Sequence, residues 1–183
     1  MSPFVFLDRD GTLVRDRGYV HRIEDYELLP GVPQALRKLA KAGFRLVIVT
    51  NQSGIGRGYF TAEDFERFQA HLVGDLGRHG VQVVRTYHCP HRPAEGCGCR
   101  KPATGLLERA QRELGADLAA SWVIGDSEGD AELARRAGCC GAVLLGSSTD
   151  TADTAATESV QQAPDLEAAA AIVIRRAADP EPS

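Results

Sequence analysis

The sequence predicts an α/β protein with a three-layer, doubly wound parallel sheet. Two observations support this: short apolar, β-branched runs alternate with helical patterns, and polar side chains follow several of those runs. Such runs are typical of strands buried on both faces. Strands that alternate with helices favour right-handed crossovers and a parallel sheet. We expect strands at Val5–Leu7, Leu46–Val49, Val81–Arg85, Trp122–Ile124 and Ala142–Leu145.

Apolar stripes with helical spacing lie between these strands, and one more follows the last strand. One stripe is preceded by Thr61, a good N-cap, with Asp64 three residues further on. Three stripes end at a glycine, which is the usual residue after a helix. We expect helices near residues 35–40, 65–76, 106–114, 128–137 and 165–177.

The chain has 183 residues, which suits one domain with its own core. We therefore expect a single domain spanning 1–183. The segment 147–163 is rich in Ser, Thr, Asp and Ala and is expected to be a mobile surface loop. Residues 179–183 are expected to be a tail.

The net charge of −4 provides no basic field that would attract nucleic acid. No apolar run approaches the roughly 20 residues needed to cross a bilayer, so no membrane association is expected. The start of the chain has no charged segment followed by an apolar one, as a signal peptide would. We expect a cytoplasmic monomer whose partner is a small molecule.

Polar side chains follow three of the predicted strands, and parallel strands bring such residues to one edge of the sheet. Several carboxylates at close range either raise a pKa or require a cation, and an all-oxygen site suits Mg²⁺. Lys101 is one of only three lysines, and it adds a fixed positive charge. The pattern predicts Mg²⁺-assisted phosphoryl transfer. The residues after the strands are Asp8 and Asp10, then Thr50, Asn51, Gln52 and Ser53, then Asp126 and Asp130.

The spacing of Asp8 and Asp10 allows two different roles. Gly11 permits a sharp turn, which can carry Asp10 above Asp8. One carboxylate can then attack phosphorus, while the other protonates the leaving oxygen and later activates water. The competing interpretation is a helix-capping aspartate beside a solvated one.

Four motifs in order resemble the haloacid dehalogenase superfamily of aspartate-nucleophile phosphatases: FLDRDGT, VTNQSGIGRG, CRKP and GDSEGD. The resemblance covers residues 4–145 and implies a Rossmann-like, haloacid dehalogenase type fold. The gaps between the motifs leave no room for a large cap domain. By matching position, the resemblance implies that Asp8 is the nucleophile, Asp10 is the general acid/base, Thr50 binds the phosphoryl group and Lys101 stabilises its charge. It also implies that Mg²⁺ is bound by Asp8, Asp126 and the backbone carbonyl of Asp10, and that Asp130 orients the metal site without binding the ion.

Three of the five cysteines lie close together, at Cys89, Cys97 and Cys99, near His88 and His91. Three thiolates and one imidazole can form a closed, structural Zn²⁺ site. Ordinary reduced thiols or a redox pair are the alternatives, and spacing does not choose between the two histidines. The heptose bisphosphate and histidinol phosphatases carry Cys-x-His…Cys-x-Cys just before Arg-Lys-Pro. That resemblance implies a zinc loop over about 88–100 with the ligands Cys89, His91, Cys97 and Cys99.

The segment 16–21 resembles the substrate loop of the heptose bisphosphate phosphatases. This resemblance implies removal of the 7-phosphate from D-glycero-D-manno-heptose 1,7-bisphosphate, a sugar phosphate, although a plain solvent turn is equally compatible with the segment. Members of that family often carry lysine where this chain has Ser127, which weakens the inference to a bisphosphate. The alternatives are a histidinol-phosphate phosphatase and a zinc-stabilised phosphate-binding module without turnover. The expected substrate-binding residues are Asp16, Arg17, Gly18, Tyr19, Asn51, Gln52, Ser53, Arg100 and Ser127.

Overall fold

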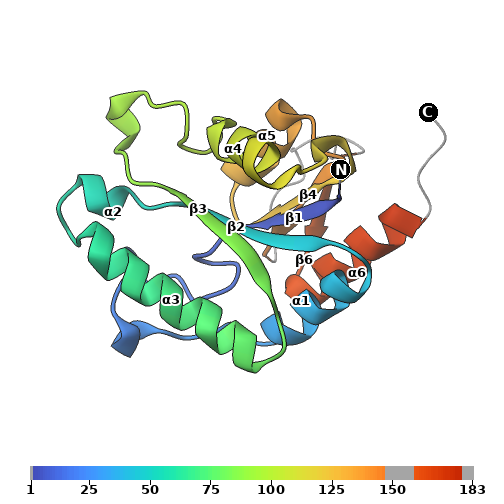
Figure 1. The fold of residues 1–183 in the computed structure, drawn as a ribbon, viewed down its shortest axis with the longest axis horizontal. Coiled ribbons are helices and arrows are strands. Elements are labelled where there is room, and N and C mark those ends of the chain that lie inside the picture. The colour runs from blue at the N-terminus through green and yellow to red at the C-terminus, as the bar shows by residue number, and fades with distance from the viewer. Residues whose placement is uncertain (1, 147–158, 179–183) are drawn as a thin grey trace.

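The computed structural model describes residues 2–146 and 159–178. Most of the expected loop, residues 147–158, and the expected tail, 179–183, lie outside the described residues. Within the described ranges, six strands form one parallel sheet in the order β3-β2-β1-β4-β5-β6 (Figure 1). The strands are β1 (Phe4–Leu7), β2 (Arg45–Asn51), β3 (Val83–Cys89), β4 (Trp122–Gly125), β5 (Gly141–Leu145) and β6 (Val160–Ala163).

Helices cover both faces of this sheet and so form the three layers that the sequence predicts (Figure 1). Helices α1, α3 and α6 pack on one face, and α4 and α5 pack on the other. The helices are α1 (Val32–Lys41), α2 (Ser53–Gly56), α3 (Ala62–Arg78), α4 (Gly105–Leu114), α5 (Glu128–Ala137) and α6 (Leu166–Ala178), with short 3₁₀ turns at Ile23–Asp25, Pro93–Glu95 and Leu118–Ala120.

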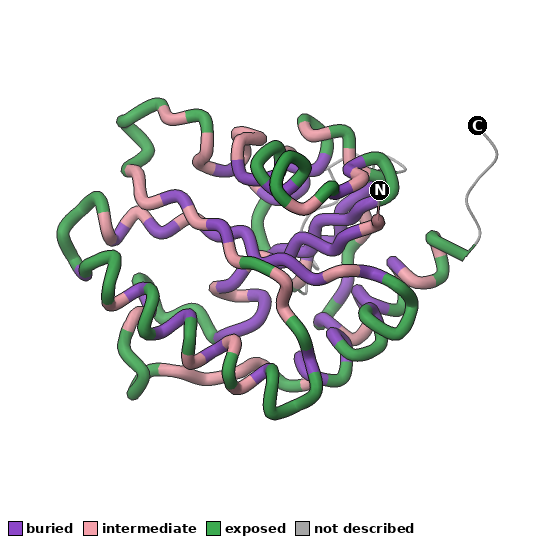
Figure 2. Tube along the Cα trace, in the orientation of Figure 1, coloured by how far each residue is buried: buried purple, intermediate pink, exposed green. Residues whose placement is uncertain are grey.

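The core lies in two layers, one on each side of the buried central strands (Figure 2). All four residues of β1 are fully buried, as are Val47, Ile48 and Val49 of β2. Alternate residues of these strands face opposite helix layers, which explains why the runs are apolar throughout. The rigid centre of the sheet therefore ends at Asp8 and Thr50, where the polar residues begin.

Helix α3 begins as the sequence predicts. Thr61 accepts a hydrogen bond from the Asp64 backbone N–H, and the Asp64 side chain accepts one from the Thr61 N–H, which completes a capping box. Helices α4, α5 and α6 also lie where they are expected, within about one residue at each end.

Two expectations about strands are wrong. The third strand spans Val83–Cys89 instead of Val81–Arg85, because it pairs with β2 from Leu46 to Asn51. The expected loop 147–163 contains β6 over Val160–Ala163, a parallel edge strand beside β5. Its sequence has two glutamines and little β-branched character, so pairing with β5 overrides a weak local preference.

The long connections contain no second folded unit in the described parts of the chain. Residues 8–31 hold only one 3₁₀ turn, and so do residues 90–104. This agrees with the expectation that no large cap domain covers the sheet edge. The site at the carboxyl ends of the strands is therefore covered only by loops.

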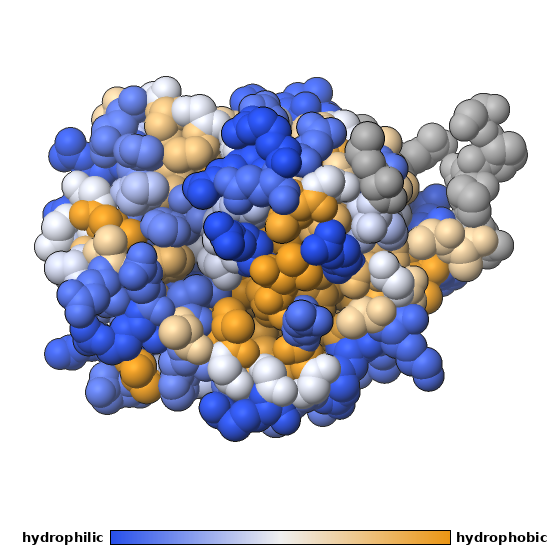
Figure 3. Space-filling model, in the orientation of Figure 1, coloured by the Kyte–Doolittle hydropathy of each residue, from blue (hydrophilic) through white to orange (hydrophobic). Residues whose placement is uncertain are grey.

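The face shown in Figure 3 carries an apolar area over β2 and β3. β3 forms the sheet edge, so Val83 and Val84 are only partly buried. None of the helices in the described ranges is both long enough and apolar enough to cross a bilayer.

Candidate active site

A cavity of about 450 Å³ opens at the carboxyl ends of β1, β2 and β4. This is the edge at which ligands bind in open parallel sheets. The cavity brings together twelve residues that the sequence predicts for the site and adds Gly129. Those twelve are Asp8, Asp10, Asp16, Gly18, Tyr19, Thr50, Asn51, Gln52, Ser53, Lys101, Asp126 and Ser127.

Lys101 lies between two carboxylates at the floor of the cavity. Its Nζ is 2.9 Å from Asp8 Oδ1 and 2.7 Å from Asp130 Oδ1, and it also donates to the Val49 carbonyl at 3.1 Å. Burial opposes the charge, but the two carboxylates outweigh it and raise the pKa of Lys101. The residue is therefore a fixed cation, although it is only 7% exposed.

Asp8 has a cation beside it, and its ionised form is still disfavoured. Burial raises its pKa to about 7, while Lys101 opposes the rise and Asp130 adds to it. Burial also raises the pKa of Asp126, and Asp130 contributes again. Carboxylate oxygens of these three aspartates all lie within 4.8 Å of one another. Such an oxygen-only group, short of positive charge, fits Mg²⁺.

Gly11 is what allows Asp126 to approach this group. Its φ of +78° suits glycine, and a Cβ at this position would overlap Asp126 Oδ2. The glycine after the two aspartates therefore permits both the turn and the close approach of the third carboxylate.

Both carboxylate oxygens of Asp130 accept a hydrogen bond. Oδ1 accepts from Lys101, and Oδ2 accepts from the Ser127 hydroxyl at 2.6 Å. Ser127 is the N-cap of α5 and forms a capping box with Asp130. Ser127 thus supports Asp130 and supplies no cation to the cavity.

The amide side chains of Asn51 and Gln52 are occupied by protein contacts. Asn51 Oδ1 accepts from the Lys101 N–H at 3.0 Å, and Asn51 Nδ2 donates to the Lys101 carbonyl at 3.2 Å. Gln52 Nε2 donates to Thr50 Oγ1 and to Asp10 Oδ2. These two residues line the cavity, and their contacts also fix the backbone of Lys101 and the carboxylate of Asp10.

Arg9 is the residue of this site that sequence reasoning missed. It is completely buried, and its guanidinium binds both carboxylate oxygens of Asp10. An arginine between two aspartates reads as a solvated residue on a turn. The only signal available was its position two residues after a buried strand.

The loop expected to bind substrate reaches the cavity in part. Asp16 accepts a hydrogen bond from the Gly18 N–H, which forms a tight turn, and Tyr19 follows with a φ of +53°. The Tyr19 ring packs edge-on against the exposed Tyr59 ring, with 4.8 Å between the ring centres. Arg17 does not line the cavity, because its guanidinium pairs with Glu27 at 2.7 Å.

A cluster of three thiols and one imidazole lies beyond the end of β3. Cys97 Sγ lies 3.5 Å from Cys89 Sγ and 3.6 Å from Cys99 Sγ. His91 Nδ1 lies 3.5 Å from Cys89 Sγ and 3.3 Å from Cys99 Sγ. A tetrahedral zinc site, with Zn–S near 2.3 Å and Zn–N near 2.0 Å, separates its ligand atoms by about 3.5–3.8 Å. The cluster therefore has nearly the dimensions of such a site.

His88 lies outside this cluster and packs against the Phe65 ring at 4.2 Å. Burial lowers the pKa of His88. The choice that spacing leaves open thus falls on His91. Arg100, just after the cluster, donates to the His91 carbonyl at 3.4 Å and is not among the residues that line the cavity.

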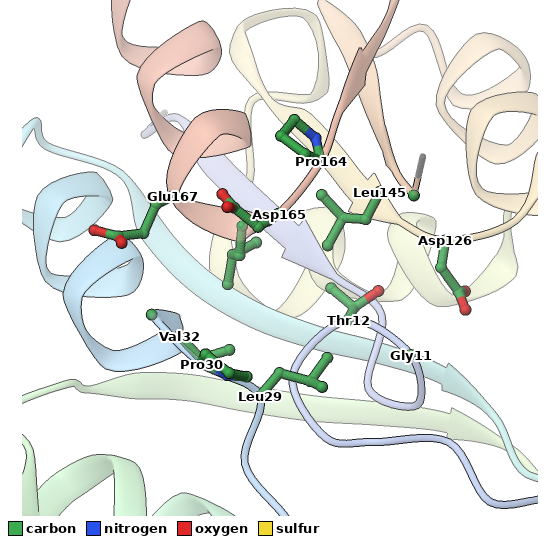
Figure 4. Close-up of a pocket in the computed structure, with 13 residues that line it drawn as sticks. Gly11, Thr12, Leu29, Pro30, Val32, Asp126, Leu145, Pro164, Asp165 and Glu167 are labelled. Carbon is green, nitrogen blue, oxygen red and sulfur yellow. The ribbon is translucent and has the colours of Figure 1, made fainter. Parts of the chain in front are cut away.

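A second cavity, of about 510 Å³, is also lined by Asp126 (Figure 4). Its walls include the apolar side chains of Leu29, Val32 and Leu145. Two of its carboxylates already have structural partners: Asp165 accepts from the Ala168 N–H, and Glu167 pairs with Lys38. The group suited to phosphate chemistry is therefore in the first cavity.

Two family models match the sequence. Residues 5–87 match a model of haloacid dehalogenase-like hydrolases, and residues 98–170 match a second model of hydrolases of the same type. Together they cover the strands that carry Asp8, Thr50 and Asp126.

Several known proteins resemble the chain over most of its length. A probable D-glycero-D-manno-heptose-1,7-bisphosphate 7-phosphatase of Thermoplasma acidophilum is 48% identical over 135 residues, which are 73% of this chain and 84% of that protein. The D-glycero-beta-D-manno-heptose-1,7-bisphosphate 7-phosphatase of Escherichia coli K12 is 45% identical over 139 residues, 72% and 73% of the two chains.

A crystal structure of D,D-heptose 1,7-bisphosphate phosphatase from B. bronchiseptica, in complex with magnesium and phosphate, superimposes with a TM-score of 0.85. It is 32% identical and covers 95% of this chain and 99% of its own. The fold, the aspartates at the sheet edge and these similarities agree, and the chain belongs to the haloacid dehalogenase-like hydrolases.

Proposed function

We propose that this protein is a Mg²⁺-dependent phosphatase that removes the 7-phosphate of D-glycero-D-manno-heptose 1,7-bisphosphate through an aspartyl-phosphate on Asp8. The observation that carries the proposal is the contact of Asp8 Oδ1 with Lys101 Nζ at 2.9 Å, beside Asp126 in a cavity open to solvent. The relatives' names supply the substrate, and the single domain 1–183 supplies every residue in the reaction.

Mg²⁺ fits the neighbouring carboxylates of Asp8 and Asp126, and the resemblance to the family adds the Asp10 carbonyl as a third ligand. When bound, it would neutralise charge that develops on the phosphoryl oxygens. Asp130 remains outside the ligand set, because both of its carboxylate oxygens already accept hydrogen bonds, one from Lys101 and one from Ser127. Its part is to keep Lys101 in place.

The side chains then divide the reaction between them. Asp8 attacks phosphorus, and the bond to the leaving oxygen breaks as Asp10 donates a proton to that oxygen. Asp10, now a carboxylate, takes a proton from water, which hydrolyses the aspartyl-phosphate and restores Asp8. Lys101 and the Thr50 hydroxyl hold the phosphoryl oxygens throughout, and preorganised groups of this kind need no rearrangement during the step.

The leaving sugar extends toward the loop that carries Gly18 and Tyr19, because that loop lines the mouth of the cavity. Lys101 is the only lysine or arginine among the described residues that line the cavity. The second phosphate of the substrate therefore lies outside the cavity, where Arg100 can meet it with a bidentate fork.

The cluster of Cys89, His91, Cys97 and Cys99 is proposed to hold a structural Zn²⁺. It ends one residue before Arg100, and Gly105 N–H donates to the Gly98 carbonyl, which ties the cluster to the start of α4. The ion would thus fix the chain on both sides of Lys101.

The proposal is tested by phosphate release in Mg²⁺ buffer. The substrates are both anomers of the heptose bisphosphate, histidinol phosphate and a nucleoside monophosphate. We expect the highest kcat/KM with a heptose bisphosphate, with ³¹P NMR showing loss of the 7-phosphate and retention of the 1-phosphate.

Other results would separate the alternatives. Preference for histidinol phosphate would replace the proposed substrate and leave the chemistry intact. Binding of phosphate without release from any ester would favour a binding module. Arg100→Ala should raise KM for the bisphosphate and leave kcat/KM for p-nitrophenyl phosphate within about twofold, since that ester has no second phosphate.

A further inference from the structure

Arg9 lies completely inside the protein, with its guanidinium against two aromatic rings. Its Cζ is 4.8 Å from the centre of the Phe68 ring and 5.6 Å from that of Phe65. Its Nη1 is buried without a hydrogen-bond partner among the described residues. A buried charge with an unsatisfied nitrogen is unfavourable for stability, and an apolar side chain of the same size often does as well. Stability alone therefore does not account for arginine at this position.

The remaining nitrogens of Arg9 hold the carboxylate of Asp10. Nε and Nη2 donate to Asp10 Oδ1 at 3.0 and 2.8 Å, and Nη2 also reaches Oδ2 at 2.9 Å. Gln52 Nε2 donates to the same Oδ2 at 2.8 Å. Both oxygens are thus fixed by donors from two elements, and the Asp10 side chain, 21% exposed, still lines the cavity.

The same guanidinium is tied to the neighbouring elements. Arg9 Nη2 donates to the Val20 carbonyl at 2.7 Å, directly after Tyr19. It also lies 3.3 Å from Gln52 Oε1, and Gln52 contacts Thr50 Oγ1. One buried group therefore connects Asp10 to the loop at the cavity mouth and to the end of β2.

We propose that Arg9, together with Gln52, positions the Asp10 carboxylate for proton transfer to the leaving oxygen. Both residues act on the reaction through Asp10, which Arg9 contacts from inside the protein and Gln52 contacts from the cavity wall. This inference rests on the proposed acid/base role of Asp10. Lysine cannot replace Arg9, because its ammonium has no planar fork to hold two oxygens while also reaching Val20.

The test compares two substrates that differ in how much they need a proton. The alcohol of a heptose phosphate leaves only with a proton, whereas the phenolate of p-nitrophenyl phosphate leaves without one. Because kcat/KM reports only the steps up to loss of the leaving group, the ratio of the two kcat/KM values measures proton donation. Histidinol phosphate replaces the heptose bisphosphate if the protein does not hydrolyse the latter.

We expect Arg9→Lys to lower this ratio roughly 10-fold or more, within the about 10²–10⁴-fold that general acid catalysis supplies. Gln52→Met, similar in volume, should lower it in the same direction and carries the test if Arg9→Lys does not fold. Arg45→Lys is the matched control. Arg45 also stacks on a phenylalanine, Phe4, at 4.7 Å, and donates to the Leu114 carbonyl, at the opposite end of the sheet. Arg45→Lys should leave the ratio of the two kcat/KM values unchanged.

Asp10→Asn separates the acid role of Asp10 from the positioning role of Arg9 and Gln52. If Asp10→Asn leaves the ratio unchanged, the proposed acid role of Asp10 is wrong. If Asp10→Asn lowers the ratio while the Arg9 and Gln52 variants keep it, the positioning role is overturned and the proposed function stands. An equal fall with both substrates in those variants would also overturn it, because that result indicates a structural role only.

Discussion

Replacing the proposed nucleophile, Asp8→Asn, should stabilise the Mg²⁺-free protein above neutral pH. The Asp8 side chain is only 13% exposed, and burial raises its pKa to about 7 from an ordinary value of 3.8. An ionised Asp8 is therefore unfavourable in the folded protein, in spite of Lys101. Asparagine keeps the shape and one acceptor oxygen without the charge.

The pH dependence of this effect follows from the two pKa values. Below about pH 4 the folded and unfolded chains both hold the proton, so the contribution of Asp8 is fully favourable. Between about pH 4 and 7 only the folded chain keeps it, and stability falls by about 1.4 kcal/mol per pH unit. The full loss approaches about 4 kcal/mol, and above about pH 7 the curve levels off. Relaxation around Asp8 lowers this figure, so we expect a gain of about 2–4 kcal/mol for Asp8→Asn at pH 8.

Thermal unfolding of both proteins between pH 4.5 and 8.5 measures this difference. The buffers contain no Mg²⁺ and no chelator, so that the thiol cluster is left intact. At pH 8 the variant should melt about 4–16 °C higher, since each kcal/mol shifts Tm by about 2–4 °C for a chain of this size. Adding Mg²⁺ should raise the Tm of the wild type and have little effect on the variant.

Asp25→Asn, at an exposed position, is the control and should follow the wild type. Comparing the proteins at each pH also cancels the effect of the exposed acids, several of which have lowered pKa values, such as Glu132. Wild-type and Asp8→Asn curves that run parallel from pH 5 to 8 would refute the reasoning, because Asp8 would then be ionised at no cost.

Two further variants test the two metal sites. Cys97→Ser should leave the purified protein with far less than one zinc per chain by metal analysis and lower its Tm, because one of four ligands is lost. The control His88→Ala should keep the zinc, and equal zinc in the wild type and both variants would exclude the site. Gly11→Ala should abolish Mg²⁺-dependent phosphate release, because its Cβ would overlap Asp126 Oδ2. The control Gly43→Ala, at a φ of +95° with open space, should only lower the free energy of unfolding by about 1–2 kcal/mol. Comparable activity in both variants would contradict the role of Asp126.

Local rules predict much of the fold because they coincide here with the tertiary structure. The Thr61 and Asp64 pair favours a helix start through contacts within four residues. A run such as Leu46–Val49 has no polar face to turn toward solvent, so it must be buried on both faces. Residues 160–163 illustrate the opposite case. Their strand exists because β5 offers an unpaired edge, and a local pattern carries no information about a partner in space.

The candidate site also has a part that the sequence predicts and a part that depends on the tertiary structure. Its residues could be selected because they follow strands, and parallel strands bring their ends together. The contacts of those residues could not be predicted, since they depend on side-chain packing. Asn51 lines the cavity but also holds the Lys101 backbone, and Arg17 is drawn away by Glu27. Arg9 escaped notice because its burial depends on Phe68, about sixty residues away in sequence.

The central claim, a phosphoryl group carried on Asp8, can be tested by trapping the intermediate. Borohydride reduces an aspartyl-phosphate to homoserine, and trypsin cleaves after Arg9, so Asp8 and Asp10 fall in different peptides, residues 1–9 and 10–15. During turnover of the heptose bisphosphate with Mg²⁺, we predict homoserine at position 8, dependent on substrate and absent from Asp8→Asn. Homoserine in the peptide 10–15, or none in either peptide during active turnover, would contradict the claim.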